Sequence, residues 1–304
     1  MEHRGYGFVK KILSFVLIML MAVGAPLQAS AASAPIYAKA AIVMDAETGE
    51  VLYNKNAGKA LYPASLTKIM TCYLALKYGD PNDMVTVDKN AVRLMREASK
   101  LGLVAGEQMT MSDMIYAMML PSANDAAKAI AIHISGSESA FVSLMNREAR
   151  ALGVRNTSFR NAHGLPDKQH VASAYDLALI TKAALQYPAF TQYAGASRHT
   201  LQATNKSKAR TVKHLNAALD KNSKYAYSGA IAGKTGWTRA AGSCLMTVAQ
   251  KNGRTLICVV LNSQGANGAK YIDTHRLLGY GFTTEAAPKT ESLNFDELRS
   301  RKSA

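Results

Sequence analysis

The chain has 304 residues, and 48% of them are hydrophobic, so it can bury a large core in one or two domains. The formal net charge is +15 at pH 7, but no nucleic-acid-binding motif accompanies it, which argues against a nucleic-acid partner. The 3 cysteines are widely spaced and fit neither a disulfide framework nor a zinc site. These properties indicate a basic globular protein.

The N-terminus has the three parts of a secretory signal peptide. Basic residues at positions 4, 10 and 11 precede an apolar stretch over 12–27, which is followed by the small residues Ala29-Ser30-Ala31. This pattern predicts a signal peptide over 1–31 with cleavage after Ala31. A membrane anchor is the alternative, although about 16 apolar residues are short for a span. We therefore expect export to the cell wall or periplasm, where anionic wall polymers or lipid head groups attract the positive charge; a diffuse basic surface without a single partner is equally compatible.

The first folded elements are expected to be a β-hairpin and a helix. Apolar segments over 38–44 and 50–54 are separated by a turn-forming sequence and predict two paired strands. A run over 65–78 has apolar residues at helical spacing, so Ser65 is expected to open a helix. Cys72 falls within this helix, where a small buried hydrophobe is a more common role than a reactive thiol.

The middle of the chain is expected to be helical, and the last third to contain strands. Helical periodicity covers 112–120, 125–134, 138–152 and 174–187. Short apolar segments then predict antiparallel strands over 230–235, 243–250 and 255–262, followed by a helix over 270–280. This order gives an α+β fold. Residues 283–304 are polar and are expected to form a mobile tail, with no C-terminal β domain.

Three short motifs carry the candidate chemistry, namely Ser65-Leu66-Thr67-Lys68, Ser122-Ala123-Asn124 and Lys234-Thr235-Gly236. The first places a hydroxyl and an amine one helical turn apart, the second offers another hydroxyl and an amide, and the third can present a cation and backbone donors from a strand. A chain of this length contains the first pattern by chance about once, but the third in about one chain in ten or fewer. Their combination indicates an active-site serine hydrolase.

Ser65 and Lys68 form the candidate nucleophile and base. At a helix start, unpaired N–H groups and the positive end of the dipole favour an oxyanion near Ser65. A desolvated Lys68 can lose its proton near neutral pH and act as the base. Each residue also has a plainer interpretation, a helix N-cap for Ser65 and a solvated surface side chain for Lys68. Ser122 and Asn124 could likewise serve turn formation and capping alone.

Together with Gly233–Thr238 and Asn161–Asp167, the three motifs resemble those of D-alanyl-D-alanine carboxypeptidases, low-molecular-mass penicillin-binding proteins related to serine β-lactamases. The resemblance covers about residues 36–282, within a catalytic domain expected over 32–282. It implies a β-lactamase/transpeptidase-like fold, in which N- and C-terminal strands build one antiparallel sheet beside a helical subdomain. It also implies action on peptidoglycan stem peptides and acylation by β-lactam antibiotics. No cofactor is expected, and no metal site either, because the seven histidines are scattered and form no HExxH motif.

The resemblance assigns a catalytic role to four residues. Ser65 would attack the carbonyl of the penultimate D-alanine, with Lys68 as its base. Ser122 would relay the proton to the leaving group. Asn124 would hydrogen-bond Lys68 and the substrate peptide.

Substrate binding is implied for six residues, namely Lys234, Thr235, Gly236, Trp237, Thr238 and Lys270. In the family, Lys234 and Thr235 match positions that bind the terminal carboxylate. The backbone N–H groups of Trp237 and Ser65 match the oxyanion hole. Small residues around Gly236 would let a peptide approach the strand edge. Relatives often carry an arginine near the start of the last helix, where this chain has Lys270, so bidentate recognition is not expected.

Three other functions are compatible with these motifs: a β-lactamase, a DD-endopeptidase and a non-catalytic wall-binding protein. A class A β-lactamase needs a loop glutamate, whereas this chain offers Asp167 and Asp176 but no glutamate over 150–238. A binding protein would not need a nucleophile beside its base. His163 suggests a serine triad, but Lys68 already supplies a base, so His163 is assigned to loop structure. We therefore expect a serine-type DD-carboxypeptidase.

Overall fold

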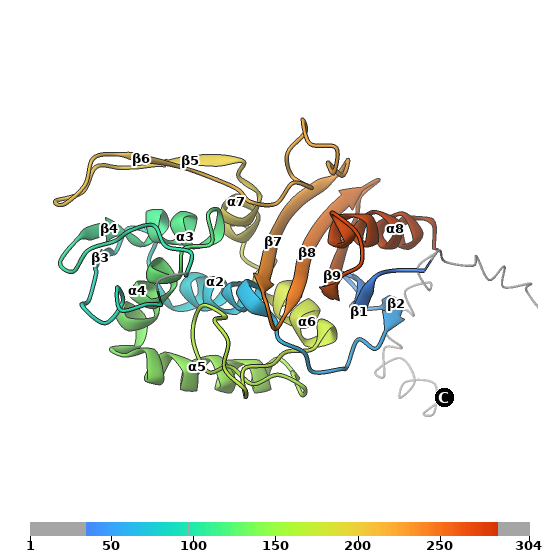
Figure 1. Cartoon of the computed structure of the whole chain (residues 1–304), viewed down its shortest axis with the longest axis horizontal. Helices are drawn as coiled ribbons and strands as arrows, with labels where there is room; N and C mark the ends of the chain where they lie inside the picture. Colours follow the sequence, from blue (N-terminus) through green and yellow to red (C-terminus); the bar gives the residue numbers. More distant parts are fainter. Residues whose placement is uncertain (1–34, 96–97, 285–304) are drawn as a thin grey trace, which may run out of the picture. The chain divides into compact units, whose positions relative to one another are not determined.

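A computed structural model describes residues 35–95 and 98–284, so the predicted signal peptide and the tail from residue 285 onward lie outside the described residues. The central feature is a five-stranded antiparallel sheet with the strand order β2-β1-β9-β8-β7 (Figure 1). Its strands are β1 (Ala38–Asp45), β2 (Val51–Lys55), β7 (Ala230–Thr238), β8 (Gly242–Lys251) and β9 (Arg254–Ser263). β1 pairs with β9, which confirms that the first and last parts of the chain build one sheet.

The sheet is buried on both faces because helices cover each of them. α8 (Ala269–Thr283) packs on one face, and α6 (Ala174–Ala184) packs on the other (Figure 1). Along β9 the side chains alternate between two hydrophobic clusters, with Val259 in the larger cluster and Val260 in the one that contains Leu278 of α8. Burial on both faces explains why β8 and β9 are mostly apolar.

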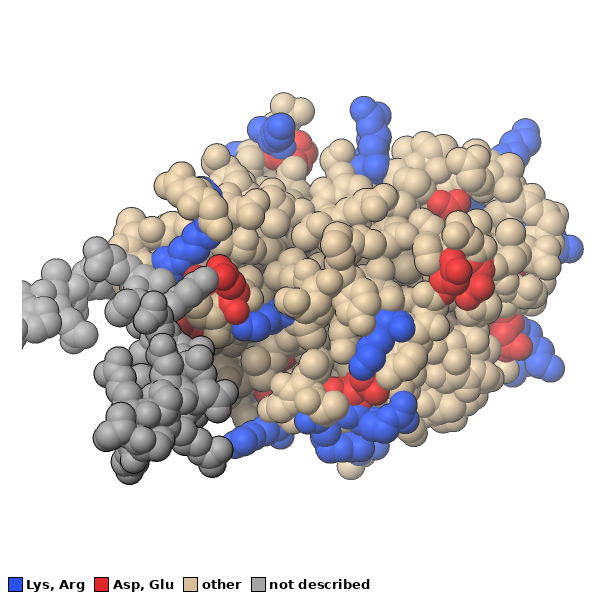
Figure 2. Space-filling model, turned by 180° about the vertical axis from the view of Figure 1, so that it is seen from behind, with Lys and Arg blue, Asp and Glu red and all other residues tan. Residues whose placement is uncertain are grey.

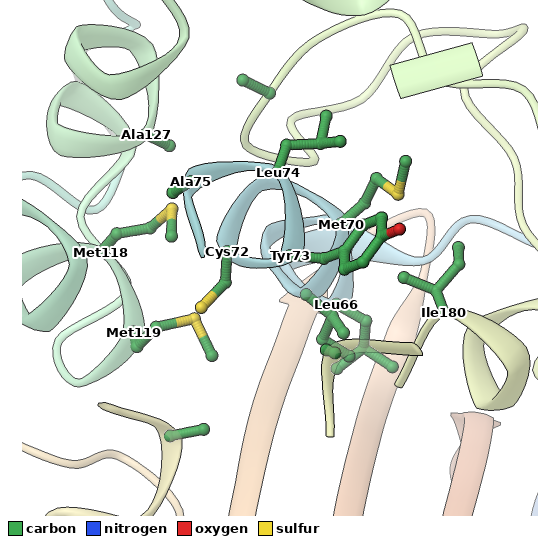
Figure 3. Packing of buried hydrophobic residues seen from close by; sticks show 14 of the residues in the cluster. Leu66, Met70, Cys72, Tyr73, Leu74, Ala75, Met118, Met119, Ala127 and Ile180 are labelled. Carbon is green, nitrogen blue, oxygen red and sulfur yellow. The ribbon is translucent and has the colours of Figure 1, made fainter. Parts of the chain in front are cut away.

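The helical region is built around α2 (Thr67–Tyr78). Every residue of this helix from Thr67 to Ala75 is buried, because other helices surround it. Those helices include α3 (Met111–Met119), α4 (Asn124–Ser135), α5 (Glu138–Ala151) and α7 (Ala189–Gly195). Figure 3 shows the Cys72 side chain directed toward Met119 within this packing. Burial raises the pKa of the Cys72 thiol, so its prediction as a buried hydrophobe is confirmed.

The predicted α+β fold is confirmed, with two kinds of difference. The helix expected from Ser65 begins as a short 3-10 turn, Ala64–Leu66, before the α-helical α2. Two small two-stranded sheets and α7 were not predicted. One sheet pairs β3 (Met84–Thr86) with β4 (Gln108–Thr110), and the other pairs β5 (Arg198–Leu201) with β6 (Arg210–Lys213). Within the described residues, no helix combines the length and the apolar character needed to cross a membrane.

Candidate active site

Ser65 lies in the 3-10 turn where the helical region meets β7. The residue before it, Ala64, is buried and has a left-handed φ of 47°, which is strained for a residue with a Cβ. Gly236 of β7 approaches this turn so closely that a Cβ there would lie 3.2 Å from the Ser65 backbone nitrogen. The Ser65 hydroxyl oxygen lies 3.1 Å from Lys68 Nζ. The described hydrogen bond of the Ser65 side chain is therefore with the Lys68 amine. The side chain of an N-cap residue would instead accept from a backbone N–H group.

Lys68 is fully buried one turn further along, so it is not a solvated surface lysine. Its Nζ donates to Asn124 Oδ1 at 2.6 Å and to the His163 carbonyl oxygen at 2.7 Å. Burial lowers the pKa of Lys68 well below its usual range, and the positive charge of Lys234 lowers it further. These neighbours favour a neutral amine.

The contacts of Lys68 suit that neutral form. A neutral amine keeps two N–H donors and gains one lone pair. The two oxygen acceptors, from Asn124 and His163, can take both donors. The lone pair is then available to the third neighbour, the Ser65 hydroxyl, as a proton acceptor. The geometry is that of a base held against its nucleophile.

Ser122 and Asn124 connect the two lysines of the site. Ser122 has a left-handed φ of 66° and is buried, and its Oγ accepts a hydrogen bond from Lys234 Nζ at 2.9 Å. Asn124 is the first residue of α4, and its backbone N–H donates to the Ser99 carbonyl oxygen at 2.9 Å. The second motif therefore contacts Lys234 through its serine and Lys68 through its amide. The motif therefore positions both lysines of the site, in addition to forming a turn.

Lys234 lies on β7 and is fully buried. Its Nζ also donates to the Thr235 carbonyl oxygen at 3.0 Å. Burial lowers the pKa of Lys234 to about 7, and the nearby charge of Lys270 contributes to this shift. Burial also lowers the pKa of Lys270, in the first turn of α8. Within the described part of the chain, Lys68, Lys234 and Lys270 form no ion pair with a carboxylate.

The residues after Lys234 differ in exposure along β7. Thr235 is buried, whereas the side chain of Trp237 is 68% exposed. The Thr238 hydroxyl oxygen accepts a hydrogen bond from the Ala241 backbone N–H at 3.0 Å, so Thr238 stabilises the turn between β7 and β8. The structure thus brings the three motifs together, and Lys270 lies close enough to Lys234 to affect its pKa.

His163 contributes its backbone to the site. Its carbonyl oxygen accepts from Lys68, whereas its ring Nδ1 accepts from the Leu165 backbone N–H at 3.2 Å. Burial lowers the pKa of His163 well below its usual range, and Lys68 adds to this effect. The ring lies 3.3 Å from Glu138 Oε1. The assignment of this side chain to loop structure is confirmed, but the carbonyl contact was not predicted.

A second histidine supports the turn that contains the nucleophile. His170 Nδ1 accepts from the Arg160 backbone N–H, so Nε2 carries the proton that it donates to Thr67 Oγ1 at 2.8 Å. The Thr67 hydroxyl in turn donates to the Ala64 carbonyl oxygen at 2.9 Å. Burial lowers the pKa of His170 to about 4, which keeps the ring neutral. This chain of hydrogen bonds supports the strained residue next to Ser65, and no sequence motif indicated it.

The two loop aspartates have structural partners. Asp176 accepts from the Asn156 backbone N–H at 2.7 Å and from the Thr157 hydroxyl at 2.8 Å. Asp167 accepts from the Gln169 backbone N–H at 2.8 Å within a turn. Neither forms a described hydrogen bond with Ser65 or Lys68. Over residues 35–95 and 98–284, no group of three His, Cys, Asp or Glu side chains could hold a metal ion.

Comparisons with known proteins agree with this geometry. A family model described as D-alanyl-D-alanine carboxypeptidase matches residues 27–265. The chain is 36% identical to the D-alanyl-D-alanine carboxypeptidase DacF of Bacillus subtilis over 84% of this chain and 67% of that protein. It is 34% identical to DacC of Escherichia coli over 79% of this chain and 60% of that protein. The crystal structure of the Streptomyces K15 DD-transpeptidase aligns with a TM-score of 0.76 and 29% identity, covering 83% of this chain and 99% of that one.

Proposed function

Because this chain belongs to the D-alanyl-D-alanine carboxypeptidase family, we propose that it removes the terminal D-alanine from peptidoglycan stem peptides through an acyl-enzyme on Ser65. The observation that carries this proposal is the 3.1 Å approach of Lys68 Nζ to Ser65 Oγ at a fully buried lysine. The experiment is to incubate the protein with a peptide ending in D-Ala-D-Ala and to measure free D-alanine. Unchanged peptide would contradict the proposal.

The first chemical step is attack on the penultimate carbonyl carbon. Lys68 accepts the proton of the Ser65 hydroxyl as the bond between Oγ and carbon forms. The amide C–N bond then breaks, and the leaving amine needs a proton. Ser122 can relay to it the proton that Lys68 took from Ser65, so that Lys68 is neutral again and Ser122 keeps its own proton; Lys234 holds the Ser122 hydroxyl at 2.9 Å. Water later hydrolyses the ester on Ser65, which returns the free enzyme and the shortened peptide.

The negative oxygen of the tetrahedral intermediate needs backbone donors. We assign this role to the N–H groups of Ser65 and Trp237, as the family pattern implies. Supporting this, Gly236 lets β7 approach the Ser65 nitrogen, where a side chain would intervene. The start of α2 adds the positive end of a helix dipole.

The terminal carboxylate of the substrate suits the cationic side of the site. Lys234, Thr235 and Lys270 are proposed to bind it, since two buried lysines without a carboxylate partner among the described residues favour an anion between them. The ammonium group of Lys270 is compact, unlike the planar guanidinium group of an arginine. Lys270 therefore attracts the carboxylate without forming two parallel hydrogen bonds to it.

This carboxylate contact predicts a pH dependence. Lys234 is charged below its pKa of about 7 and loses its charge as the pH rises through that value. For a substrate ending in a free carboxylate, kcat/KM should therefore fall about tenfold per pH unit on the alkaline side. The same peptide with a C-terminal amide is the control, and its kcat/KM should lack this decline. If kcat/KM falls equally with rising pH for the two substrates, Lys234 does not recognise the carboxylate.

β-Lactams are proposed to acylate Ser65 by the same route. A β-lactamase would also need rapid deacylation, but Asp167 and Asp176 are engaged in loop hydrogen bonds. A DD-endopeptidase would use the same nucleophile on cross-linked peptides. A non-catalytic wall-binding protein is disfavoured by the contact of Ser65 with a buried base.

We also propose that residues 1–31 direct export and that 32–282 form the catalytic domain, so that the mature protein acts in the cell wall or periplasm. Residues 1–31 account for +2 of the formal charge of +15, and the remaining +13 would attract the mature protein to anionic wall polymers. N-terminal sequencing of the mature protein tests the cleavage site, and the expected first residue is Ala32. An intact N-terminus would contradict the proposed processing.

A further inference from the structure

The positive charge of the chain is concentrated in one segment, residues 197–239, which we call the basic segment. It contains nine Lys and Arg residues and one acidic residue, Asp220, so it carries a formal charge of +8 out of the total of +15. The segment includes the hairpin of β5 and β6, the loop that follows, and β7 (Figure 1). A local excess of positive charge favours one binding location for an anionic partner, whereas a uniformly basic surface does not.

Seven of these cations are exposed: Arg198, Lys206, Lys208, Lys213, Lys221, Lys224 and Arg239. None of the seven forms an ion pair with another described residue. The two others have partners, since Arg210 pairs with Glu107 and Lys234 contacts Ser122. Figure 2 shows one face of the molecule, on which Lys and Arg are interspersed with Asp and Glu. The segment thus presents seven exposed cations and one exposed acidic residue, Asp220.

Two of the exposed cations directly oppose each other. Arg198 of β5 pairs in register with Lys213 of β6, and like charges at opposed positions destabilise a hairpin. The hairpin is held instead by other contacts, including the ion pair of Arg210 with Glu107 and the 2.8 Å contact between His199 Nε2 and Asp113 Oδ1. Arg198 and Lys213 therefore do not stabilise the hairpin through each other. An anion bound between them would remove their repulsion and would give both side chains a function.

Arg198 and Lys213 line a pocket of about 330 Å³ together with polar residues of the following loop. One of these, Asn216, is only 1% exposed, and its Nδ2 has no hydrogen-bond partner among the described residues. Asp220 also lies on the pocket wall, where its Oδ1 accepts from the Asn222 backbone N–H at 3.0 Å. Arg198 and Lys213 are both exposed and are suited to bind a phosphate-sized anion between them.

The pocket-lining loop adjoins the active site. The backbone N–H of Leu215 donates to the Leu120 carbonyl oxygen at 3.2 Å, two residues before Ser122. Asn216 packs against Gly233, the residue before Lys234. A polymer bound along the basic segment would therefore lie beside the catalytic strand.

We propose that the basic segment docks a phosphodiester polymer of the cell wall and that one phosphate is seated between Arg198 and Lys213. This inference rests on the export and wall location proposed above. Seven cations spread over a hairpin and a loop match a repeating anion, whereas one carboxylate would need only one or two of them. The concave pocket also fits a discrete phosphate better than a flat lipid surface does.

The test measures binding of protein 32–304 to poly(glycerol phosphate) at low salt. The double substitution Arg198→Glu and Lys213→Glu is compared with Lys39→Glu and Lys89→Glu, which makes the same change of charge at exposed positions outside the segment. We expect the first variant to bind at least about tenfold more weakly and the second to bind within about twofold of the unmodified protein. Thermal unfolding verifies that both variants are folded.

Equal weakening in both variants would overturn the proposal, because only total charge would then matter. Absence of polymer binding at low salt would overturn it as well. So would tighter binding to vesicles of phosphatidylglycerol than to the polymer, since the partner would then be a membrane. Penicillin acylation is measured in parallel and should be unchanged in both variants. If the unmodified protein binds the polymer but is not acylated by penicillin, the catalytic proposal is refuted and the docking proposal is still supported.

Discussion

Replacing Ser65 with alanine is expected to abolish covalent labelling by penicillin while leaving the protein folded. The substitution removes the atom that forms the acyl bond, and its side chain is only partly buried, so the free energy of unfolding should change by no more than about 1 kcal/mol. Intact-protein mass spectrometry after penicillin treatment measures the adduct. Thermal unfolding measures the stability.

Ser228→Ala is the matched control for this change, because Ser228 is an exposed serine outside the three motifs. That variant should acquire one penicillin adduct, as the unmodified protein does. An adduct that persists on Ser65→Ala would assign the nucleophile to another residue.

The second large effect is expected for Lys68→Arg. Arginine keeps the positive charge, but a guanidinium does not deprotonate in a protein, so the base is lost. The acylation rate should fall by about a thousandfold, within the range that general-base catalysis contributes. Stopped-flow or quenched acylation by a chromogenic β-lactam measures it.

Lys77→Arg is the control, since Lys77 lies in the same helix and forms a more exposed pair with Glu148. It should acylate at nearly the unmodified rate. Because Lys68 is fully buried, a larger arginine could also disturb packing, so Lys68→Met is tested beside it. If either folded variant at position 68 acylates at the unmodified rate, Lys68 is not the base.

The main sheet could be predicted from the sequence because its strands are long and strongly apolar. β8 and β9 each span 10 residues with nearly all side chains buried, so their pattern stands out without knowledge of the partner strand. β3 and β4 have 3 residues each, and β5 and β6 have 4 each. Strands this short contain too few alternations to be distinguished from loops, and tertiary contacts stabilise them.

The motif residues could be predicted because their side chains carry the chemistry. The supporting contacts could not, because they use groups that every residue possesses. The His163 carbonyl oxygen contacts Lys68, and the Ala64 carbonyl oxygen receives the hydrogen bond from Thr67. Carbonyl groups leave no signal in a sequence, and their positions depend on the folded chain.

The backbone strain at the site could not be predicted from the sequence either. Ala64 and Ser122 both have left-handed φ angles, 47° and 66°, although neither is a glycine or asparagine. Each adjoins or belongs to a catalytic motif, and each is buried. The surrounding contacts hold these conformations, which present Ser65 to Lys68 and Ser122 to Lys234.

The most direct test of the central claim is to locate the acyl bond. The protein is treated with penicillin, digested, and analysed by tandem mass spectrometry. We expect the added mass on Ser65 and on no other residue, because Ser65 alone combines a hydroxyl with a contact to the buried Lys68 amine among the described residues. An adduct on Ser122, or no adduct at all on protein that is folded, would contradict acyl transfer through Ser65.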